Sequence, residues 1–271
     1  GQISVSLLFA YTQLIGQINA PVVDLFSSLN ELRETEKSMR RLDELFLLPE
    51  ERTDGACGLL DASLPVVCRN LPLPGIPEGL SLQVSSGECI GIAGESGVGK
   101  TTLLRLLCGF CEPPSGSLLL FGRSVSQWNL SELRKQISCV FQENQIFPGT
   151  VRENISFSRP GATLSEIEAA ARLSGLDGFI RQLPKQYDTM LQANGAEWSG
   201  GQYQRLNLAR AFLQDALLYL FDEPSASLDE EMERLLIESI HTLRQAGKTV
   251  LIISHRPALL RACDRVLQLS R

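Results

Sequence analysis

The sequence predicts an α/β domain with a mainly parallel sheet, preceded by one long N-terminal helix. Three observations support this fold class: short apolar runs that resemble buried strands, helical stretches between them, and a glycine-rich loop that joins one run to the next helix. The apolar runs are Cys89–Ala93, Ile137–Phe141, Leu217–Phe221, Thr249–Ile253 and Arg265–Leu269. The helical stretches are Thr101–Cys108, Ser165–Ser174, Gly200–Gln214 and Glu230–Gln245. Strands that alternate with helices indicate a parallel sheet with helices on its faces.

The composition is that of a globular protein. The chain has 271 residues, of which 44% are hydrophobic and 21% are charged, and this length suits one mid-sized domain with an appendage. The net charge of −6 argues against general nucleic-acid binding, which normally requires a basic surface. We therefore expect no nucleic-acid partner.

Seven cysteines are scattered without regular spacing, a pattern that does not suggest a disulfide framework and fits a reducing compartment. Cys108 and Cys111 form a C-x-x-C pair, which is either half of a zinc or redox site or simply two small apolar residues at the end of a helix. We favour the second interpretation because the chain has no second C-x-x-C pair and only two histidines, His241 and His255.

The N-terminal part is expected to form one helix. Residues 3–29 are mainly apolar and long enough to span a bilayer, which needs about 20 residues, but polar residues interrupt them at Gln13, Gln17, Asn19 and Asp24. Either an amphipathic helix packed on a soluble core or the inner end of a membrane helix fits this pattern. Residues 30–48 continue it with charged residues at helical spacing and end before Pro49. Because the chain starts inside an apolar stretch without a methionine, we expect a fragment of a longer protein.

The glycine-rich loop has the sequence GESGVGKT and matches the phosphate-binding pattern G-x-x-x-x-G-K-[ST]. Its glycines let backbone amides surround phosphates, and the following helix N-terminus adds about half a positive charge. Lys100 would contact the β- and γ-phosphates, and Thr101 would offer its hydroxyl to Mg²⁺. We assign nucleotide contacts to Gly94, Glu95, Ser96, Gly97, Val98, Gly99, Lys100, Thr101 and Thr102.

Two carboxylates end another apolar run. Asp222 and Glu223 follow Leu217–Phe221 directly, and carboxylates at the end of a strand in a phosphate-binding sheet lie beside the phosphates. Asp222 is the candidate ligand of Mg²⁺. Glu223 is the candidate general base that orients and polarises the attacking water.

Together with four further motifs, these residues resemble the ATP-binding cassette (ABC) ATPase family. The sequence WSGGQYQR, residues 198–205, resembles the family signature L-S-G-G-Q-x-Q-R with Trp198 in place of leucine. Gln142 matches the Q-loop, residues 225–229 match the D-loop, and His255 matches the switch histidine. The resemblance covers about residues 64–271 and implies a P-loop NTPase core with antiparallel β and helical subdomains.

The resemblance also implies roles and a partner. Gln142 would contact Mg²⁺ and assist catalysis, and His255 would contact the γ-phosphate. The residues Ser199, Gly200, Gly201 and Gln202 begin a helix, so they would form a second anion-binding surface. In the family, two cassettes pair head to tail, and each ATP lies between the phosphate loop of one and the signature of the other. We therefore expect a second ABC cassette as partner, in a homodimer or a heterodimer.

Several segments resemble the exporter branch of the family. Residues 146–155 resemble the exporter pattern that follows the Q-loop, and residues 183–189 resemble the exporter run L-P-x-G-Y-D-T. The helix before the cassette resembles the last membrane helix and its cytosolic extension. The implied organisation is a transmembrane helix end at residues 1–48, a linker at 49–63 and the nucleotide-binding domain at 64–271, with its helical subdomain at about 143–200. The implied location is the cell membrane, with the cassette on the cytoplasmic side and its own transmembrane domain as partner.

Two departures from the family pattern stand out. The family usually places an aromatic residue about 25 residues before the phosphate-loop lysine to stack on adenine, but Leu71–Gly75 contains none. Because base stacking is worth about 1–3 kcal/mol, its loss would weaken ATP binding by about tenfold or more. Gln192–Gly195 lacks the acidic and basic pair that exporters carry before the signature, which bears on coupling to the membrane domain.

Two alternatives to an exporter ATPase follow from this sequence. The first is a weakly hydrolysing, regulatory half of a heterodimeric transporter, which the missing aromatic residue favours. The second is a non-transport ABC ATPase, but such relatives carry long coiled coils or tandem cassettes, which this chain does not show. Because Glu223 and His255 are both present, we expect hydrolysis of ATP with Mg²⁺.

Overall fold

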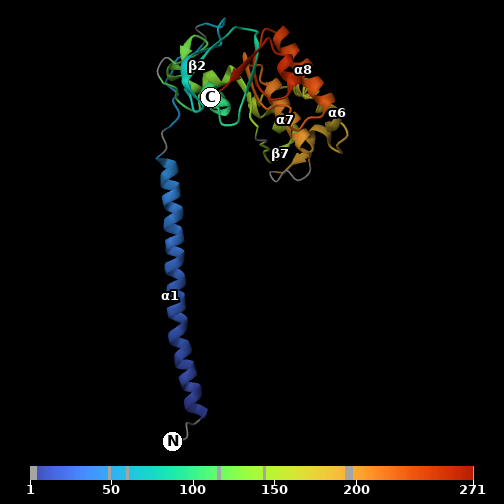
Figure 1. Ribbon diagram of the computed structural model, residues 1–271. Helices are drawn as coiled ribbons and strands as arrows, with labels where there is room; N and C mark the ends of the chain where they lie inside the picture. Colours follow the sequence, from blue (N-terminus) through green and yellow to red (C-terminus); the bar gives the residue numbers. More distant parts are fainter. Residues whose placement is uncertain are drawn as a thin grey trace. The chain divides into compact units, whose positions relative to one another are not determined.

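The computed structural model describes residues 5–47, 50–58, 61–114, 117–142, 145–192 and 198–270. The chain divides into two compact units, Gly1–Glu51 and Arg52–Arg271. The first unit consists of helix α1, Val5–Phe46 (Figure 1), which agrees with the predicted long helix. Apolar side chains such as Phe9 and Phe26 are exposed along it. Among the described residues, no helix combines the length and apolar character that crossing a membrane requires.

The second unit is built on a five-stranded sheet with the strand order β11-β3-β10-β9-β6, in which every neighbouring pair is parallel. This sheet confirms the predicted fold class, and its strands coincide with the five predicted apolar runs to within one residue at each end. Their bounds are β3 Cys89–Gly94, β6 Ile137–Val140, β9 Leu218–Asp222, β10 Thr249–Ile253 and β11 Arg265–Leu269.

Helices cover the parallel sheet. The four predicted helical stretches form α2 Lys100–Leu107, α5 Leu164–Leu173, α7 Gly200–Leu213 and α8 Glu230–Gln245. Shorter α-helices are α3 Leu130–Lys135, α4 Val151–Ile155, α6 Asp177–Ile180 and α9 Pro257–Arg261, and single 3₁₀ turns lie at Val125–Gln127, Ser156–Ser158 and Gln186–Asp188. In Figure 1, α6, α7 and α8 lie together on one side of the second unit.

The parallel sheet separates two hydrophobic cores because successive side chains of a strand point to opposite faces. Leu251 and Ile253 of β10 pack into one core, with helix α2 and the antiparallel sheet. Val250 and Ile252 pack into the other core, with helices α5, α7 and α8. All five residues of β10 are buried, as expected for a strand covered on both faces.

A second sheet is antiparallel, with the strand order β2-β1-β4-β5. Its bounds are β1 Val66–Leu73, β2 Ile76–Val84, β4 Leu118–Leu120 and β5 Arg123–Ser124, and a separate two-stranded ladder pairs β7 Gly149–Thr150 with β8 Met190–Leu191. Strands β1 and β2 are joined by the two residues Pro74 and Gly75, because Leu73 pairs with Ile76. The antiparallel β structure expected from the family resemblance is therefore present.

The parallel direction of the strands brings their carboxyl ends to one edge of the sheet. At this edge β3 leads into the glycine-rich loop, β6 leads to Gln142, β9 ends at Asp222, and β10 leads to His255. Ligand sites in open α/β sheets lie at this edge, so the topology alone brings together residues that are far apart in the sequence.

Candidate nucleotide site

The glycine-rich loop joins β3 to α2 and folds around the lysine side chain. The Nζ atom of Lys100 donates hydrogen bonds to the carbonyl oxygens of Gly94, at 2.6 Å, and Glu95, at 2.9 Å. Gly99, which directly precedes α2, has φ +107°, in a region that favours glycine. A Cβ atom there would lie 3.0 Å from the side chains of Leu73 and Pro74. The loop carbonyls therefore hold the ammonium group of Lys100 at the start of α2.

Asp222 lies at the end of β9 and is only 4% exposed. The Thr101 hydroxyl donates to its Oδ2 at 3.4 Å. Burial raises the pKa of Asp222, and the nearby Glu223 carboxylate acts in the same direction, while the hydrogen bond from Thr101 and the charge of Lys100 oppose the rise. A buried carboxylate with a raised pKa is typical of a functional site.

Glu223 has a left-handed backbone, with φ +50°, which is unfavourable for a residue other than glycine. Its N–H donates to the carbonyl oxygen of Ile253 at 2.9 Å, and its own carbonyl accepts from Ala226. The Oε1 atom of Glu223 lies 2.7 Å from Nδ1 of His255. Since an ionised carboxylate can only accept, the imidazole donates through Nδ1 and leaves Nε2 free for another group. The strained turn therefore holds a carboxylate and an imidazole together.

Most of the predicted site residues line one cavity of about 410 Å³. From the glycine-rich loop and α2 it is lined by Gly94, Ser96, Gly97, Gly99, Lys100, Thr101 and Thr102, and from the other strand ends by Gln142, Asp222, Glu223 and His255. Pro74 completes the lining and was not singled out from the sequence. Glu95 and Val98 do not line the cavity, and Val98 is fully buried in the core beneath the loop.

The signature residues lie outside this cavity, at the start of α7. The hydroxyl of Ser199 accepts from the N–H of Gln202 at 3.3 Å, and the Gln202 side chain accepts from the N–H of Ser199 at 2.7 Å, which forms a capping box. A Cβ atom on Gly201 would lie 2.8 Å from the carbonyl oxygen of Ser227, and Gly200 faces the same serine. The signature therefore packs against the segment that follows Glu223.

Trp198, which replaces the leucine of the family signature, is 9% exposed. Its ring packs edge-on against Phe179, with 5.0 Å between ring centroids, and stacks with Tyr203 at 5.9 Å. The substitution thus fills a hydrophobic core. The predicted departure at residues 192–195 lies mostly outside the described residues.

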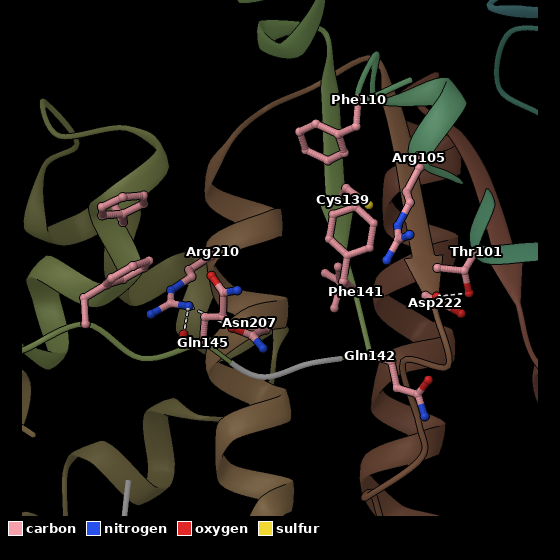
Figure 2. A pocket seen from close by; sticks show the side chains of 13 residues that line it. Thr101, Arg105, Phe110, Cys139, Phe141, Gln142, Gln145, Asn207, Arg210 and Asp222 are labelled. Carbon is pink, nitrogen blue, oxygen red and sulfur yellow. Dashed lines mark hydrogen bonds between the residues drawn. The ribbon is translucent and has the colours of Figure 1, made fainter. Parts of the chain in front are cut away.

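Gln142 also borders a second cavity, of about 530 Å³, shown in Figure 2. Arg210 of α7 is on one side of it, and its guanidinium donates to carbonyl oxygens of Gln145 and Asn154. Burial lowers the pKa of Arg210 to about 10. On the other side lie Thr101 and Asp222 of the first cavity. The two cavities therefore share Thr101, Gln142 and Asp222 in their lining.

Arg256, like Pro74, was not predicted from the sequence to have a role at the site. Its guanidinium donates to the Glu233 carboxylate at 2.6 Å and to the carbonyl oxygens of Leu228, at 3.3 Å, and Ala226, at 3.5 Å. Glu233 is only 8% exposed. Because Arg256 directly follows His255, it ties the loop that carries the imidazole to the segment that packs on the signature.

The residues present fit a magnesium ion. Mg²⁺ prefers oxygen ligands and is usually held by one or two carboxylates together with substrate phosphates. The Thr101 hydroxyl, the Asp222 carboxylate and the Gln142 side-chain amide supply such oxygens within one cavity.

The fold and the cavity define a P-loop nucleotide-binding domain. The family model described as "ABC transporter" matches residues 77–226. Over its whole length the chain is 33% identical to the leukotoxin export ATP-binding protein LtxB of Aggregatibacter actinomycetemcomitans, and 33% identical to the leukotoxin translocation ATP-binding protein LktB of Mannheimia glucosida. The chain belongs to the ABC transporter family, as the sequence motifs predicted.

A solved structure of an ABC exporter also resembles this chain. A bacterial Atm1-family ABC exporter with ATP bound superposes with a TM-score of 0.78 and 29% sequence identity, over 98% of this chain and 47% of that one. The chain spans 39% of the length of the two leukotoxin proteins.

The buried carboxylate at the end of β9 should lower the stability of the fold. Because the folded-state pKa of Asp222 is raised, ionised Asp222 disfavours folding above that pKa, and the penalty disappears as the pH falls through it. Asp222→Asn should therefore unfold at higher denaturant concentration than wild type at neutral pH, with a difference that shrinks on acidification. Asp61→Asn is the control: hydrogen bonds from Ser63 lower the pKa of Asp61, so its replacement should change stability in the opposite direction. A stability loss in Asp222→Asn at neutral pH would contradict this assignment.

Removing the Arg256 side chain should lower the stability of the fold. Arg256→Met leaves the buried Glu233 carboxylate without its guanidinium, which should lower the free energy of unfolding by about 1–3 kcal/mol, measured by chemical denaturation. The control is Arg234→Met on helix α8, which also carries Glu233, because the Arg234–Glu230 pair is highly exposed on both sides and should contribute little. Equal losses in the two variants would show that Arg256 has no special structural role.

Proposed function

We propose that this chain binds and hydrolyses ATP to power export of a substrate across a membrane, as the nucleotide-binding part of an ABC exporter. The observation that carries the proposal is the convergence of the Lys100 loop, Asp222, Glu223 and His255 on one cavity. The names of the two leukotoxin proteins and of the Atm1-family exporter support export as the purpose of hydrolysis.

In the proposed reaction the loop amides and Lys100 would hold the phosphates, and Thr101, Asp222 and Gln142 would hold Mg²⁺. The bound ion would neutralise charge on the β- and γ-phosphates. Glu223 accepts a proton from the attacking water as general base, because its carboxylate is held at the cavity wall by the turn after β9. His255 steadies that carboxylate through Nδ1 and offers Nε2 to the γ-phosphate. Phosphoryl transfer needs little beyond such positioning and charge.

A second cassette would complete the site. The signature residues Ser199, Gly200, Gly201 and Gln202 begin a 14-residue helix but do not line the cavity of their own chain. A helix N-terminus with free amides is suited to bind phosphate. We propose that the signature of one chain covers the phosphate loop of another, in a homodimer or heterodimer, so that ATP holds the two together.

The exporter assignment also implies a domain organisation and a location for the chain. Residues 1–48 would be the end of the last transmembrane helix and its cytosolic extension, residues 49–63 a linker, and residues 64–271 the nucleotide-binding domain. The helical subdomain would cover about residues 143–200. The cassette would lie on the cytoplasmic side of the cell membrane, joined to its own transmembrane domain.

One observation favours a second candidate function. Apart from the imidazole of His255, no described residue that lines the nucleotide cavity is aromatic, and Leu71–Gly75 offers no aromatic residue where the family places one against adenine. Weak ATP binding of this kind would suit a regulatory half of a heterodimeric transporter that hydrolyses little.

Hydrolysis is tested by Mg-ATP turnover of the full-length protein in lipid. Glu223→Gln should lower kcat by about 10²- to 10⁴-fold, the usual contribution of a general base. Glu238→Gln is the matched control, because Glu238 is exposed on α8, and it should leave kcat unchanged. Turnover that survives Glu223→Gln would reject Glu223 as the base, and a wild type without turnover would favour the regulatory half.

The shared site is tested by complementation between two inactive variants. Lys100→Ala and Ser199→Arg should each abolish turnover alone, since each spoils both sites of a homodimer. A mixed dimer of the two keeps one site intact, so co-expression should restore at most about a quarter of the wild-type sites. Purification through two different tags isolates that dimer, and inactive mixed dimers would contradict a site shared between chains.

A further inference from the structure

Two cysteine side chains from distant parts of the sequence meet at the start of β3. Cys89 is the first residue of this strand and is fully buried, whereas Cys263 follows α9 and is partly exposed. The N–H of Asp264 donates to the carbonyl oxygen of Cys89 at 2.9 Å, and the N–H of Cys89 donates to the Asp264 carboxylate at 2.9 Å. These two bonds fix the start of β3 to the residue that follows Cys263. Neither cysteine is among the residues that line the nucleotide cavity.

Gly91 leaves the space that the Cys263 thiol occupies. Alternate residues of a strand point to the same face, so position 91 shares its face with Cys89. A Cβ atom on Gly91 would lie 3.3 Å from Sγ of Cys263 and 2.9 Å from Cδ2 of Leu260. When protonated, Cys263 donates to the carbonyl oxygen of Leu259 at 3.4 Å. The sulfur of Cys263 is therefore held over β3, on the face that carries the Cys89 thiol, and it packs against the core that contains Cys89.

The two thiols differ in how readily they ionise. The hydrogen bond from Cys89 lowers the pKa of Cys263, and the Arg244 guanidinium acts in the same direction, while burial and the Asp264 carboxylate oppose the change. The same hydrogen bond, together with burial, raises the pKa of Cys89. Arg244 also forms an ion pair with Asp264, which keeps its charge near both sulfur atoms. A partly exposed thiol that ionises readily thus lies beside a buried thiol that stays protonated.

A second pair of thiols in the cassette does not share this property. Cys139 lies on β6 in the wall of the larger cavity (Figure 2) and is hydrogen-bonded to the buried Cys108. The hydrogen bond and burial raise the pKa of Cys139. Because the thiolate is the nucleophilic form of cysteine, this second pair presents no activated sulfur. A readily ionised thiol next to a second cysteine is instead the arrangement typical of redox-sensing sites.

We propose that Cys263 and Cys89 form an oxidation site, at which hydrogen peroxide converts Cys263 to a sulfenic acid and Cys89 then closes a disulfide with it. In the first step the Cys263 sulfur attacks one peroxide oxygen and the O–O bond breaks. The hydroxide that leaves takes up the thiol proton as water, so the sulfur is oxidised and the peroxide is reduced. In the second step the Cys89 sulfur attacks the sulfenic sulfur, the S–O bond breaks, and the hydroxyl group leaves with the Cys89 proton as water.

The first step prepares the second. The charge on the Cys263 sulfur is what makes the hydrogen bond raise the pKa of Cys89, and a neutral sulfenic acid no longer carries that charge. Cys89 therefore ionises more readily once Cys263 has been oxidised. The disulfide would join β3, which leads into the phosphate loop, to the segment that α9 connects to His255. In a reducing compartment such a bond is transient.

The experiment treats the full-length protein in lipid with hydrogen peroxide, blocks free thiols with N-ethylmaleimide and maps unreduced peptides by mass spectrometry. The disulfide between Cys89 and Cys263 should be the first oxidation product of the wild type, and dithiothreitol should reverse it. Cys89→Ala should stop the reaction at the sulfenic acid, which dimedone then captures on Cys263. Cys263→Ser should leave Cys89 unmodified.

A charge substitution tests what activates the thiol. Arg244→Gln removes the positive charge that favours the Cys263 thiolate and leaves Asp264 without its ion pair, so Cys263 should be oxidised at least about threefold more slowly. The matched control is Arg234→Gln on the same helix, α8, whose side chain pairs with the exposed Glu230, and it should leave the rate unchanged. Equal rates in these two variants would show that Arg244 does not activate Cys263.

Two results with the wild type would overturn the proposal. One is oxidation of the exposed Cys57 or Cys111 before Cys263, since exposure alone would then decide the reaction. The other is a Cys263 that passes to the sulfinic acid while Cys89 remains a free thiol. Mapping the wild type needs no substitution, so a variant that does not fold leaves this test intact. Neither readout involves ATP, so failure here would not bear on the proposed function.

Discussion

The burial of β9 and β10 on both faces is the constraint on which the rest of the site depends. Their side chains alternate between two cores, so neither strand can slip by one residue without exchanging its two faces. The ends of these strands position Asp222, Glu223 and His255, and the neighbouring β3 positions the glycine-rich loop. The precision of a polar site is thus set by apolar packing beneath it.

Local sequence patterns were enough to predict most of this arrangement. The parallel strands are short apolar runs, the loop has fixed glycine spacing, and Asp222 and Glu223 follow a buried strand directly. Each of these signals lies within a few consecutive residues. Parallel strands align their carboxyl ends at one edge of the sheet. The predicted parallel topology therefore also placed the loop, the two carboxylates and His255 close together.

Contacts between distant segments could not be predicted in the same way. Gly75 appeared in the sequence only as the place where an aromatic residue is lacking, and its approach to the backbone of Val98 has no local signature. Arg256 reaches carbonyl oxygens 28 and 30 residues earlier in the chain, and many arginines in the sequence look alike. Val98 belongs to the phosphate-loop pattern, yet its side chain serves the core beneath the loop, because a pattern of residue types does not state which way each side chain points.

Thr101, Gln142 and Asp222 border both cavities of the cassette, and this shared wall has a thermodynamic consequence. Anything that occupies the larger cavity and shifts these three groups changes the affinity of the smaller cavity for its nucleotide. Reciprocity then requires the nucleotide to change the affinity of that occupant by the same factor. An occupant that shifts the shared wall would therefore couple the two cavities thermodynamically, whichever cavity it binds.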